Sequence, residues 1–311
     1  MSELALVIGY MLDLTIGDPR WLPHPVRMIG KEIEILEKVL RKLRPEKLSG
    51  TILALTVISS VFLISYLLIQ SADRFKPLRL GVESFLIFTL LCTRSLADEP
   101  MKVVRELERG RIDEARRYLS HLVSRDTRGL NEAGILRACI ETVAENTVDG
   151  LISPLFYLAL GGVPAMIAFK AVSTLDSMVG YRDERYIRFG WASARLDDIA
   201  NFIPARLSVL LIPFSAFILN LNGSNAFRVA LRDGGKHESP NSGLPEAAFA
   251  GALGVRLGGP AVYGGVRVDR PFIGDELEPL TPGKVREAVK LMRLCSAITA
   301  FTALGVLILR G

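Results

Sequence analysis

The fold is decided by residues 48–71, LSGTILALTVISSVFLISYLLIQS, a run of apolar and small polar side chains without a charge. An α-helix rises about 1.5 Å per residue, so a helix of this length crosses a bilayer hydrocarbon core, which is roughly 30 Å thick. Residues 207–227 are equally free of charged side chains. Both segments predict transmembrane helices.

Three other apolar segments extend this pattern. Residues 294–309 are slightly short, but Arg293 and Arg310 at their ends can extend their charged groups to the membrane surface. Residues 4–16 and 85–93 are shorter still, and they form either half-buried helices or additional spans. The sequence thus predicts an all-α, polytopic integral membrane protein with four to six membrane-embedded helices.

A Gly-Gly-Val-Pro sequence at 161–164 interrupts a further apolar stretch, residues 151–169. Each half is about ten residues long and too short to span a bilayer alone. The segment is therefore either one kinked transmembrane helix or a re-entrant hairpin. In the hairpin, protein or water must satisfy the irregular backbone at membrane depth.

Composition limits the classes of partner. The chain has 311 residues, of which 50% are hydrophobic and 23% are charged, and its net charge is +5. The basic excess is spread along the chain, so nothing indicates nucleic-acid binding. Basic loops on the cytoplasmic side of a membrane explain the excess. We expect a single membrane-embedded domain, 1–311, with a polar helical insertion at about 96–150 and a Gly/Pro-rich polar region at about 228–290.

The first polar motif follows the N-terminal apolar segment. Residues 17–27, GDPRWLPHPVR, contain enough Gly and Pro to fix an irregular turn. Held in such a turn, Asp18, His24 and Arg27 are candidates to bind a phosphate or a metal. The alternative is a capping Asp and a loop His that is bonded to the backbone.

The second motif is a row of carboxylates. Glu141, Glu145 and Asp149 are spaced by four residues, so a helix places them on one face, with Asn146 beside them. Like charges at this spacing repel one another, and the row runs into an apolar segment in which ionised carboxylates are costly. Mg²⁺ or a cluster of arginines would compensate this cost. The alternative is a solvated acidic stripe on a surface helix.

The third motif comprises two polar runs, 174–182 and 195–206. Asp197 and Asp198 precede Asn201 by three to four residues, so their oxygens can share a helix face. Such oxygens suit a metal–phosphate site. Arginines that suit anionic oxygens are Arg182, Arg195 and Arg206. The alternative is pairing between these Arg and Asp side chains within the protein.

The fourth motif is a turn, residues 239–243 (SPNSG), followed by a glycine-rich stretch at 251–265 where backbone can approach a ligand closely. The chain contains no Gly-x-x-x-x-Gly-Lys-Ser/Thr sequence. A nucleotide site here is therefore not of the P-loop type.

These motifs together resemble the CobD/CbiB family, the adenosylcobinamide-phosphate synthases of cobalamin biosynthesis. The matching pieces occur in family order over nearly the whole chain: 17–19 with 24–26, 141–150, 174–181, 194–198 with 204–206, and 239–241 leading to 257–259. The chain departs from the family pattern at Ser173, where Asn is expected, and at Leu244, where an aromatic residue is frequent. Neither departure changes a charged group.

The resemblance implies a membrane enzyme of the ATP-dependent carbon–nitrogen ligase class. It would join the corrinoid adenosylcobyric acid to (R)-1-aminopropan-2-ol or its O-phosphate and give adenosylcobinamide or its phosphate. Because a carboxylate is a poor electrophile, ATP would first convert it into an acyl phosphate. That step requires Mg²⁺ and electrostatic stabilisation, and the attack requires a base near the amine.

The motif positions assign candidate roles to individual residues. The metal-ligand candidates are Glu145, Asp149, Asp197 and Asp198. The catalytic candidates are Glu141, Glu145, His24 and Asp176, with His24 or Glu141 as the base. The candidates for substrate or phosphate binding are Asp18, Arg27, Asn146, Ser177, Arg182, Arg195, Asn201, Arg206, Ser239 and Asn241.

Two other function classes fit the motifs less well. One is a membrane transferase that binds a lipid diphosphate through Mg²⁺, and the other is a corrinoid-binding or transport protein. The second predicts pseudo-symmetry between halves of the chain, which the sequence lacks. We expect a multi-pass plasma-membrane protein whose site faces the cytoplasm, because residues 20–47 contain eight basic and four acidic side chains. Association with other membrane enzymes of the corrinoid pathway, or with a second copy, is also expected.

Overall fold

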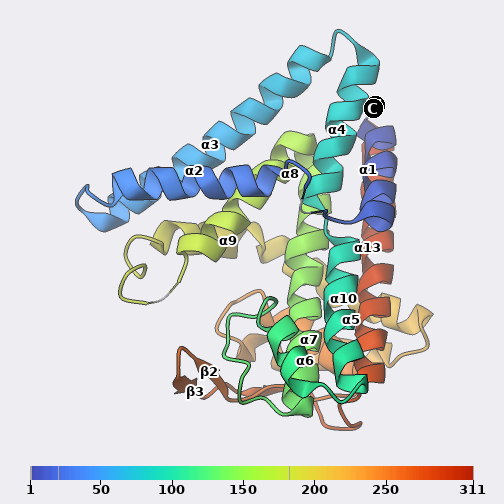
Figure 1. Cartoon of the computed structure of the whole chain (residues 1–311). Helices are drawn as coiled ribbons and strands as arrows, with labels where there is room; N and C mark the ends of the chain where they lie inside the picture. Colours follow the sequence, from blue (N-terminus) through green and yellow to red (C-terminus); the bar gives the residue numbers. More distant parts are fainter. Residues whose placement is uncertain (1, 20, 182, 311) are drawn as a thin grey trace. The chain divides into compact units, whose positions relative to one another are not determined.

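The computed structural model describes residues 2–19, 21–181 and 183–310, and Figure 1 shows that they are mostly helical. Among these residues, four helical stretches are long and apolar enough to cross a membrane, or five if a bent pair is counted as one span. The stretches are Glu46–Ala72, Lys76–Glu108, Glu132–Val179 and Pro282–Arg310, and the bent pair is Trp191–Ala200 with Phe202–Ile218. This arrangement confirms the predicted all-α, polytopic class.

The chain divides into two compact units, and each is assembled from segments that are distant in sequence. Unit 1 comprises residues 1–92, 149–201 and 299–311. Unit 2 comprises residues 93–148 and 202–298.

Unit 1 is built from long apolar helices. They are α1 (Ser2–Ile16), α2 (Pro25–Leu40), α3 (Glu46–Ala72), α4 (Lys76–Leu90), α8 (Ser153–Val179), α9 (Trp191–Ala200) and the end of α13 (Pro282–Arg310). Helix α1 packs on α4, and α8 packs against α2 and α3. Buried side chains such as Leu53, Leu155 and Phe189 belong to one apolar core. Membrane-facing helices of this kind keep apolar side chains on both their buried and their lipid-exposed faces.

Helix α8 is interrupted near its centre. Gly161 has φ −139° and ψ 16°, and Gly162 has φ 69° and ψ −165°, so neither residue is helical. Glycine reaches the positive φ without strain because it has no Cβ. The predicted break at 161–164 is therefore confirmed. Both the kinked span and the re-entrant hairpin contain such a break, and the choice between them stays a prediction.

Unit 2 combines shorter helices with two small antiparallel strand pairs. Its helices are α5 (Thr93–Glu108), α6 (Ile112–Leu119), α7 (Glu132–Thr147), α10 (Phe202–Ile218), α11 (Gly223–Asp233), the 3₁₀ turn η2 (Gly234–Lys236), α12 (Gly243–Leu253) and the start of α13. Its strands are β1 (Leu257–Gly258), β2 (Ala261–Tyr263), β3 (Val266–Val268) and β4 (Phe272–Ile273), paired as β1 with β4 and β2 with β3. A π-helical turn, η1 (Val148–Ile152), continues the chain from α7 to α8.

Residues 207–227 do not form the single transmembrane helix that the sequence predicts. Helix α10 ends at Ile218, and α11 begins only at Gly223. Asn220 adopts a positive φ of 56°, and the Asn222 side chain caps α11 by accepting a hydrogen bond from the Asn225 N–H at 2.9 Å. Asparagine tolerates this backbone region and competes with helical hydrogen bonds, so the apolar pattern alone overestimates the helix.

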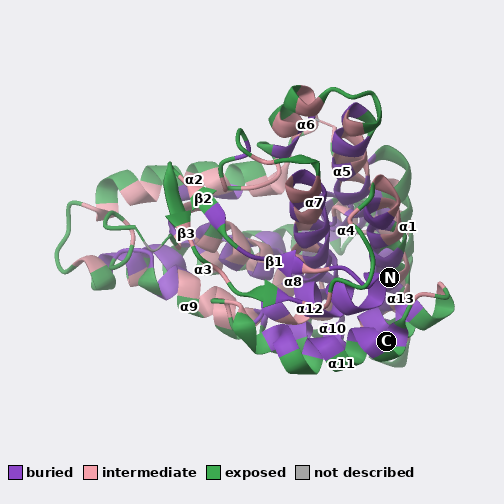
Figure 2. Ribbon diagram, turned by 90° about the horizontal axis from the view of Figure 1, so that it is seen from below, coloured by how far each residue is buried: buried purple, intermediate pink, exposed green. Residues whose placement is uncertain are grey.

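Helix α12 is almost fully buried, as the purple ribbon in Figure 2 shows, and it packs against α10 and α11. It ends at Gly254, whose φ of 67° suits a helix C-terminus because glycine bears no Cβ. The only charged side chain of α12 is Glu246, which is 2% exposed. A lone buried carboxylate on an apolar helix points to a polar site in unit 2.

Candidate functional site

Glu141 of α7 is anchored on both of its carboxylate oxygens. One oxygen, Oε2, forms an ion pair with Arg125, and the other, Oε1, accepts a hydrogen bond from the Gly258 N–H at 2.7 Å. Gly258 has φ 70°, and a Cβ there would lie 2.5 Å from the Pro271 carbonyl oxygen, so only glycine fits. With both oxygens bonded, Glu141 is better placed to hold the β1 backbone than to accept a proton.

Glu145, one turn further along α7, approaches the turn that precedes α12. Its Oε1 accepts a hydrogen bond from the Ser242 hydroxyl at 3.2 Å. The neighbouring Asn146 donates its side-chain amide to the Thr142 carbonyl at 3.0 Å, a bond within its own helix. The structure therefore brings Glu145, and not Asn146, to the 239–243 turn.

Glu246 completes a cluster of three carboxylates, in which Glu141 and Glu246 are buried and Glu145 is half-buried. Its Oε1 lies 3.7 Å from the Nε2 atom of His237, and its Oε2 is buried without a hydrogen-bond partner. Among the described residues, no Lys or Arg nitrogen lies within 4.0 Å of this carboxylate. Burial raises the pKa of Glu246 well above its ordinary value, and the negative charges of Glu141 and Glu145 act in the same direction.

Positive charge near the cluster is held by other partners. Arg125 is committed to Glu141, and Arg270 donates a hydrogen bond to the Tyr263 hydroxyl at 3.2 Å. Both arginines lower the pKa of Glu246, but burial outweighs them. The cluster therefore has more carboxylates than directly paired cations.

The 239–243 turn adjoins Glu246, whose N–H donates to the Ser242 carbonyl at 3.3 Å, and it is fixed by its own polar side chains. The Ser239 hydroxyl accepts hydrogen bonds from the N–H groups of Asn241 at 3.2 Å and Ser242 at 3.3 Å. His237 Nδ1 accepts from the Ser239 N–H at 3.0 Å, and Arg206 donates to the Asn241 side-chain oxygen at 3.3 Å. Three predicted binding residues, Ser239, Asn241 and Arg206, are thus joined in one network beside the cluster.

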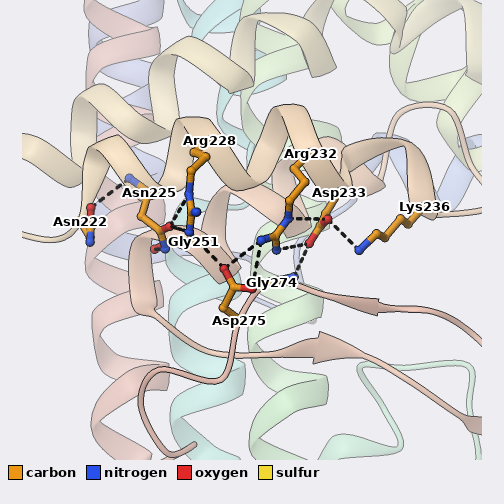
Figure 3. Close-up of polar contacts among 9 residues, drawn as sticks. All are labelled: Asn222, Asn225, Arg228, Arg232, Asp233, Lys236, Gly251, Gly274 and Asp275. Carbon is orange, nitrogen blue, oxygen red and sulfur yellow. Dashed lines mark hydrogen bonds and ion pairs between the residues drawn. The ribbon is translucent and has the colours of Figure 1, made fainter.

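A second buried carboxylate of unit 2, Asp233, is satisfied completely (Figure 3). Arg232 donates to both of its oxygens, at 2.8 and 2.7 Å, and the Gly274 N–H donates at 2.8 Å. Lys236 pairs with it at 2.7 Å, and Arg232 also pairs with Asp275 at 3.0 Å. The Arg232 hydrogen bonds hold the pKa of Asp233 well below its ordinary value. We interpret this group as a structural clamp between α11 and β4.

In unit 1, the N-terminal motif forms a polar turn before α2. His24 is the N-cap of α2, and its Nδ1 accepts a hydrogen bond from the Val26 N–H at 3.3 Å. Its Nε2 lies 3.5 Å from Asp18, while Arg27 donates to the Leu22 carbonyl at 2.5 Å. Burial lowers the pKa of His24, so the neutral ring carries its proton on Nε2, facing Asp18. The structure thus shows the backbone-bonded His of the alternative, but the N-cap is His24 itself and not an Asp, and binding of a phosphate or metal here stays a prediction.

The Asp-Asp motif lies on α9, also in unit 1. Asp197 accepts a hydrogen bond from the Asn201 amide at 3.1 Å, and the Asn201 oxygen accepts one from the Ser153 hydroxyl at 2.6 Å. Asp198 pairs with Arg195 at 3.6 Å. The predicted grouping of Asp197 with Asn201 is confirmed, and Asp198 shows the Arg–Asp pairing that was the alternative.

The remaining predicted residues lie on η1 and α8. The backbone carbonyl of Asp149 lies 3.5 Å from the Lys170 ammonium. Asp176 sits so close to Gly180 that a Cβ there would lie 2.0 Å from its Oδ1, and Ser177 donates to the Ser173 carbonyl at 2.9 Å. Arg182 lies outside the described residues. Unit 1 therefore contains Asp149, Asp197 and Asp198, whereas Glu145 belongs to unit 2.

Comparison with known proteins now identifies the relatives of this chain. Residues 6–292 match the family described as CobD/Cbib protein. The chain belongs to the CobD/CbiB family. A relative named cobalamin biosynthesis protein CobD, from Geobacter metallireducens, is 51% identical over 94% of this chain and 93% of its own length. The cobalamin biosynthesis protein CbiB of Salmonella typhimurium is 44% identical over 96% of this chain and 95% of its own length. No solved structure matches.

The donor atoms of this family member suit Mg²⁺ in kind, because Mg²⁺ prefers carboxylate oxygens. The described residues nevertheless contain no group of three or more His, Cys, Asp or Glu side chains arranged to hold a metal ion. Mg²⁺ usually keeps several waters and is held by one or two carboxylates together with substrate phosphates. The residues therefore fit a metal that arrives with a phosphorylated substrate.

Sequence reasoning missed four charged residues of these groups. Arg125 and Arg270 lie in loops of mixed charge, and nothing in the sequence distinguishes them from solvated neighbours. Glu246 carried a detectable signal as the only charge of α12, and Lys170 carried one as the only cation of α8, which also contains Asp176. Such a charge is costly to bury and is therefore a functional candidate.

Proposed function

We propose that this family member acts in cobalamin biosynthesis as a membrane ligase. It joins adenosylcobyric acid to (R)-1-aminopropan-2-ol or its O-phosphate and converts ATP to ADP and phosphate. Support comes from the relatives named for cobalamin biosynthesis. The single structural observation that carries the proposal is the carboxylate cluster, in which one buried oxygen of Glu246 is unpaired and Glu145 is bonded to a Ser- and Asn-rich turn.

The chemistry of the reaction matches the charges around this turn. Amide formation joins a carboxylate to an ammonium ion, so the amine must be bound as a cation and must release a proton before it attacks. The carboxylate must first be phosphorylated by ATP, which places several negative phosphate oxygens in the site. Glu145 and Glu246 suit the cation, and Arg206 and Arg270 suit the anions.

The base for the amine stays a proposal between His24 and Glu141. Glu141 already has one partner on each carboxylate oxygen, the Arg125 guanidinium and the Gly258 N–H. The neutral His24 ring directs its Nε2–H at Asp18, and its Nδ1 accepts the Val26 N–H. His24 can therefore take a proton from the amine only if its Nε2 proton moves to Asp18 or its hydrogen bond with Val26 opens.

Mg²⁺, when bound, would screen the triphosphate charge as the phosphoryl group is transferred. We propose that one or two carboxylates from the predicted candidates Glu145, Asp149, Asp197 and Asp198 hold it together with the phosphates of ATP, with Asp197 and Asp198 of α9 as the first choice. We also propose a site that faces the cytoplasm, where ATP is available. Asp197→Asn and Asp198→Asn should each raise the Mg²⁺ concentration needed for half-maximal turnover at least tenfold. The exposed Asp269 provides the control, Asp269→Asn, which should not change it. Unchanged Mg²⁺ dependence in folded variants of both acids would refute this assignment.

The reaction itself is tested by mass spectrometry. Detergent-purified protein would be incubated with adenosylcobyric acid, Mg²⁺, ATP and either aminopropanol or its phosphate. We expect a corrinoid product that is heavier by the amine minus water, formed only with ATP and in step with ADP. If folded protein binds the corrinoid but forms no amide with either amine, the ligase function is wrong.

A further inference from the structure

Glu246 is a buried carboxylate that lacks the partner its environment requires. The residue is 2% exposed and its Oε2 has no hydrogen bond. Within the part of the chain that the structure describes, the one basic side-chain nitrogen within ion-pair distance is His237 Nε2, at 3.7 Å. His237 Nδ1 accepts the Ser239 N–H, so a neutral ring can direct only one N–H, on Nε2, at Oε1. Oε2 therefore remains unsatisfied, and an unsatisfied buried oxygen costs about 1–3 kcal/mol.

The surroundings of Glu246 favour a positively charged ligand. Glu141 and Glu145 add negative charge to the same cluster, and both act on Glu246 electrostatically. His237, which lies 3.7 Å from Glu246, is 16% exposed, so one contact partner of the carboxylate reaches the surface. The Ser242 hydroxyl, bonded to Glu145, lies on the turn just before α12. A small cation that entered here would meet several oxygen acceptors.

We propose that the Glu246 carboxylate binds the ammonium group of the amine substrate through its unpartnered Oε2 atom. This inference rests on the proposed ligase function and names the residue that selects a primary amine. An ammonium group is a compact cation with three N–H donors and no acceptor, so it matches an oxygen-lined, acceptor-rich cluster.

An organic ammonium suits this position better than Mg²⁺. Mg²⁺ demands near-octahedral oxygen coordination and gives up its waters reluctantly. The described residues offer no group of three metal-ligating side chains here or elsewhere. A single deficient carboxylate oxygen instead matches the charge of one ammonium ion.

The test compares Glu246→Gln with Glu238→Gln in the full-length protein. Gln keeps the shape of Glu but removes the charge, and the exposed Glu238 lies on the same segment. Glu246→Gln should raise KM for the amine on the order of 100-fold, because the partner of a buried charge pair is lost. KM for ATP, KM for the corrinoid and the Mg²⁺ requirement should stay within threefold, and Glu238→Gln should change none of them. Glu246→Asp should recover part of the affinity.

A second measurement does not depend on any variant. Wild-type protein should bind labelled aminopropanol phosphate in the absence of ATP and Mg²⁺, and propane-1,2-diol phosphate, in which a hydroxyl replaces the amine, should compete at least 100-fold more weakly. Equal competition by the diol phosphate would overturn the proposal. The proposal would also be overturned if Glu246→Gln left KM for the amine unchanged, or if this variant required more Mg²⁺ than the wild type. This binding is measured without turnover, so it tests the inference separately from the ligase function. If the amine binds in a way that depends on Glu246 but no amide forms, the ligase function is wrong and this inference still holds.

Discussion

Unit 2 contains two buried acids that are only thirteen residues apart in sequence and have opposite surroundings. Asp233 is fully enclosed, and each of its oxygens is bonded to Arg232 and to a second partner. Glu246 is equally enclosed but keeps one oxygen without a partner. The difference teaches that burial of an acid alone does not indicate a site. A buried acid stabilises the fold when its partners lie within the protein and suggests a ligand when they do not.

The largest effect on stability is expected when Arg125, which pairs with Glu141 in the carboxylate cluster, is replaced. Arg125→Met leaves Glu141 buried without its cation and should lower the free energy of unfolding by about 3–5 kcal/mol. Arg117 is 66% exposed and pairs with Glu114 at the surface, so Arg117→Met should cost less than about 1 kcal/mol. Thermal unfolding in detergent would check both. Similar losses in the two variants would mean that Arg125 is no structural anchor.

Removal of the clamp acid should have the next largest effect. Asp233→Ala deprives the Gly274 N–H and Arg232 of their acceptor and should destabilise the protein by about 2–3 kcal/mol. The pKa of Asp233 is lowered, so its contribution is complete above the unfolded Asp pKa, about 3.9, and is lost as pH falls through the lower folded value. In Asp233→Asn this acid-dependent loss should disappear. An acid unfolding profile identical to that of the wild type would contradict the clamp.

Glu246→Gln should change the free energy of unfolding in the opposite direction to the Asp233 substitutions. Because the pKa of Glu246 is raised, its stabilising contribution is complete below the unfolded Glu pKa, about 4.3, and is lost as pH rises through the higher folded value. At pH 8 the variant should therefore be more stable than the wild type by about 1–2 kcal/mol, and the advantage should vanish in acid. Unfolding midpoints measured from pH 4 to 8 would show this. A variant that is less stable at pH 8 would mean that the charge of Glu246 is compensated in the fold.

The smallest effect on stability is expected at the hydrogen bond that joins Glu145 of α7 to Ser242, just before α12. Ser242→Ala removes the 3.2 Å hydrogen bond to Glu145 and should cost about 0.5–1 kcal/mol. Ser120 bonds only within its own helix at the surface, so Ser120→Ala is the matched control and should be neutral within about 0.5 kcal/mol. A loss above 2 kcal/mol for Ser242→Ala would reveal a larger network than the one described.

The sequence predicts the membrane class well because its signals are local. The uncharged run in Glu46–Ala72 and the Gly161–Gly162 break both follow from residues adjacent in the chain. The prediction failed at 207–227, where hydropathy outweighed the turn chemistry of Asn220 and Asn222. An average over twenty side chains conceals two residues that redirect the backbone.

The site was predicted only where its members share a helix. The spacing of Glu141 and Glu145 places them on one face of α7, and Asp197 and Asn201 meet in the same way on α9. Glu246 reaches Glu145 only through tertiary packing across about one hundred residues of chain, and no local period encodes such a distance. The partners that distinguish Asp233 from Glu246 are likewise set by the fold.

The interleaving of the two units has a consequence for synthesis. Residue 298 is the last residue of unit 2, whereas unit 1 also includes residues 299–311, which are translated later. Domains generally fold as units during translation. The carboxylate cluster of unit 2 can thus assemble on the nascent chain before residues 299–311 join unit 1.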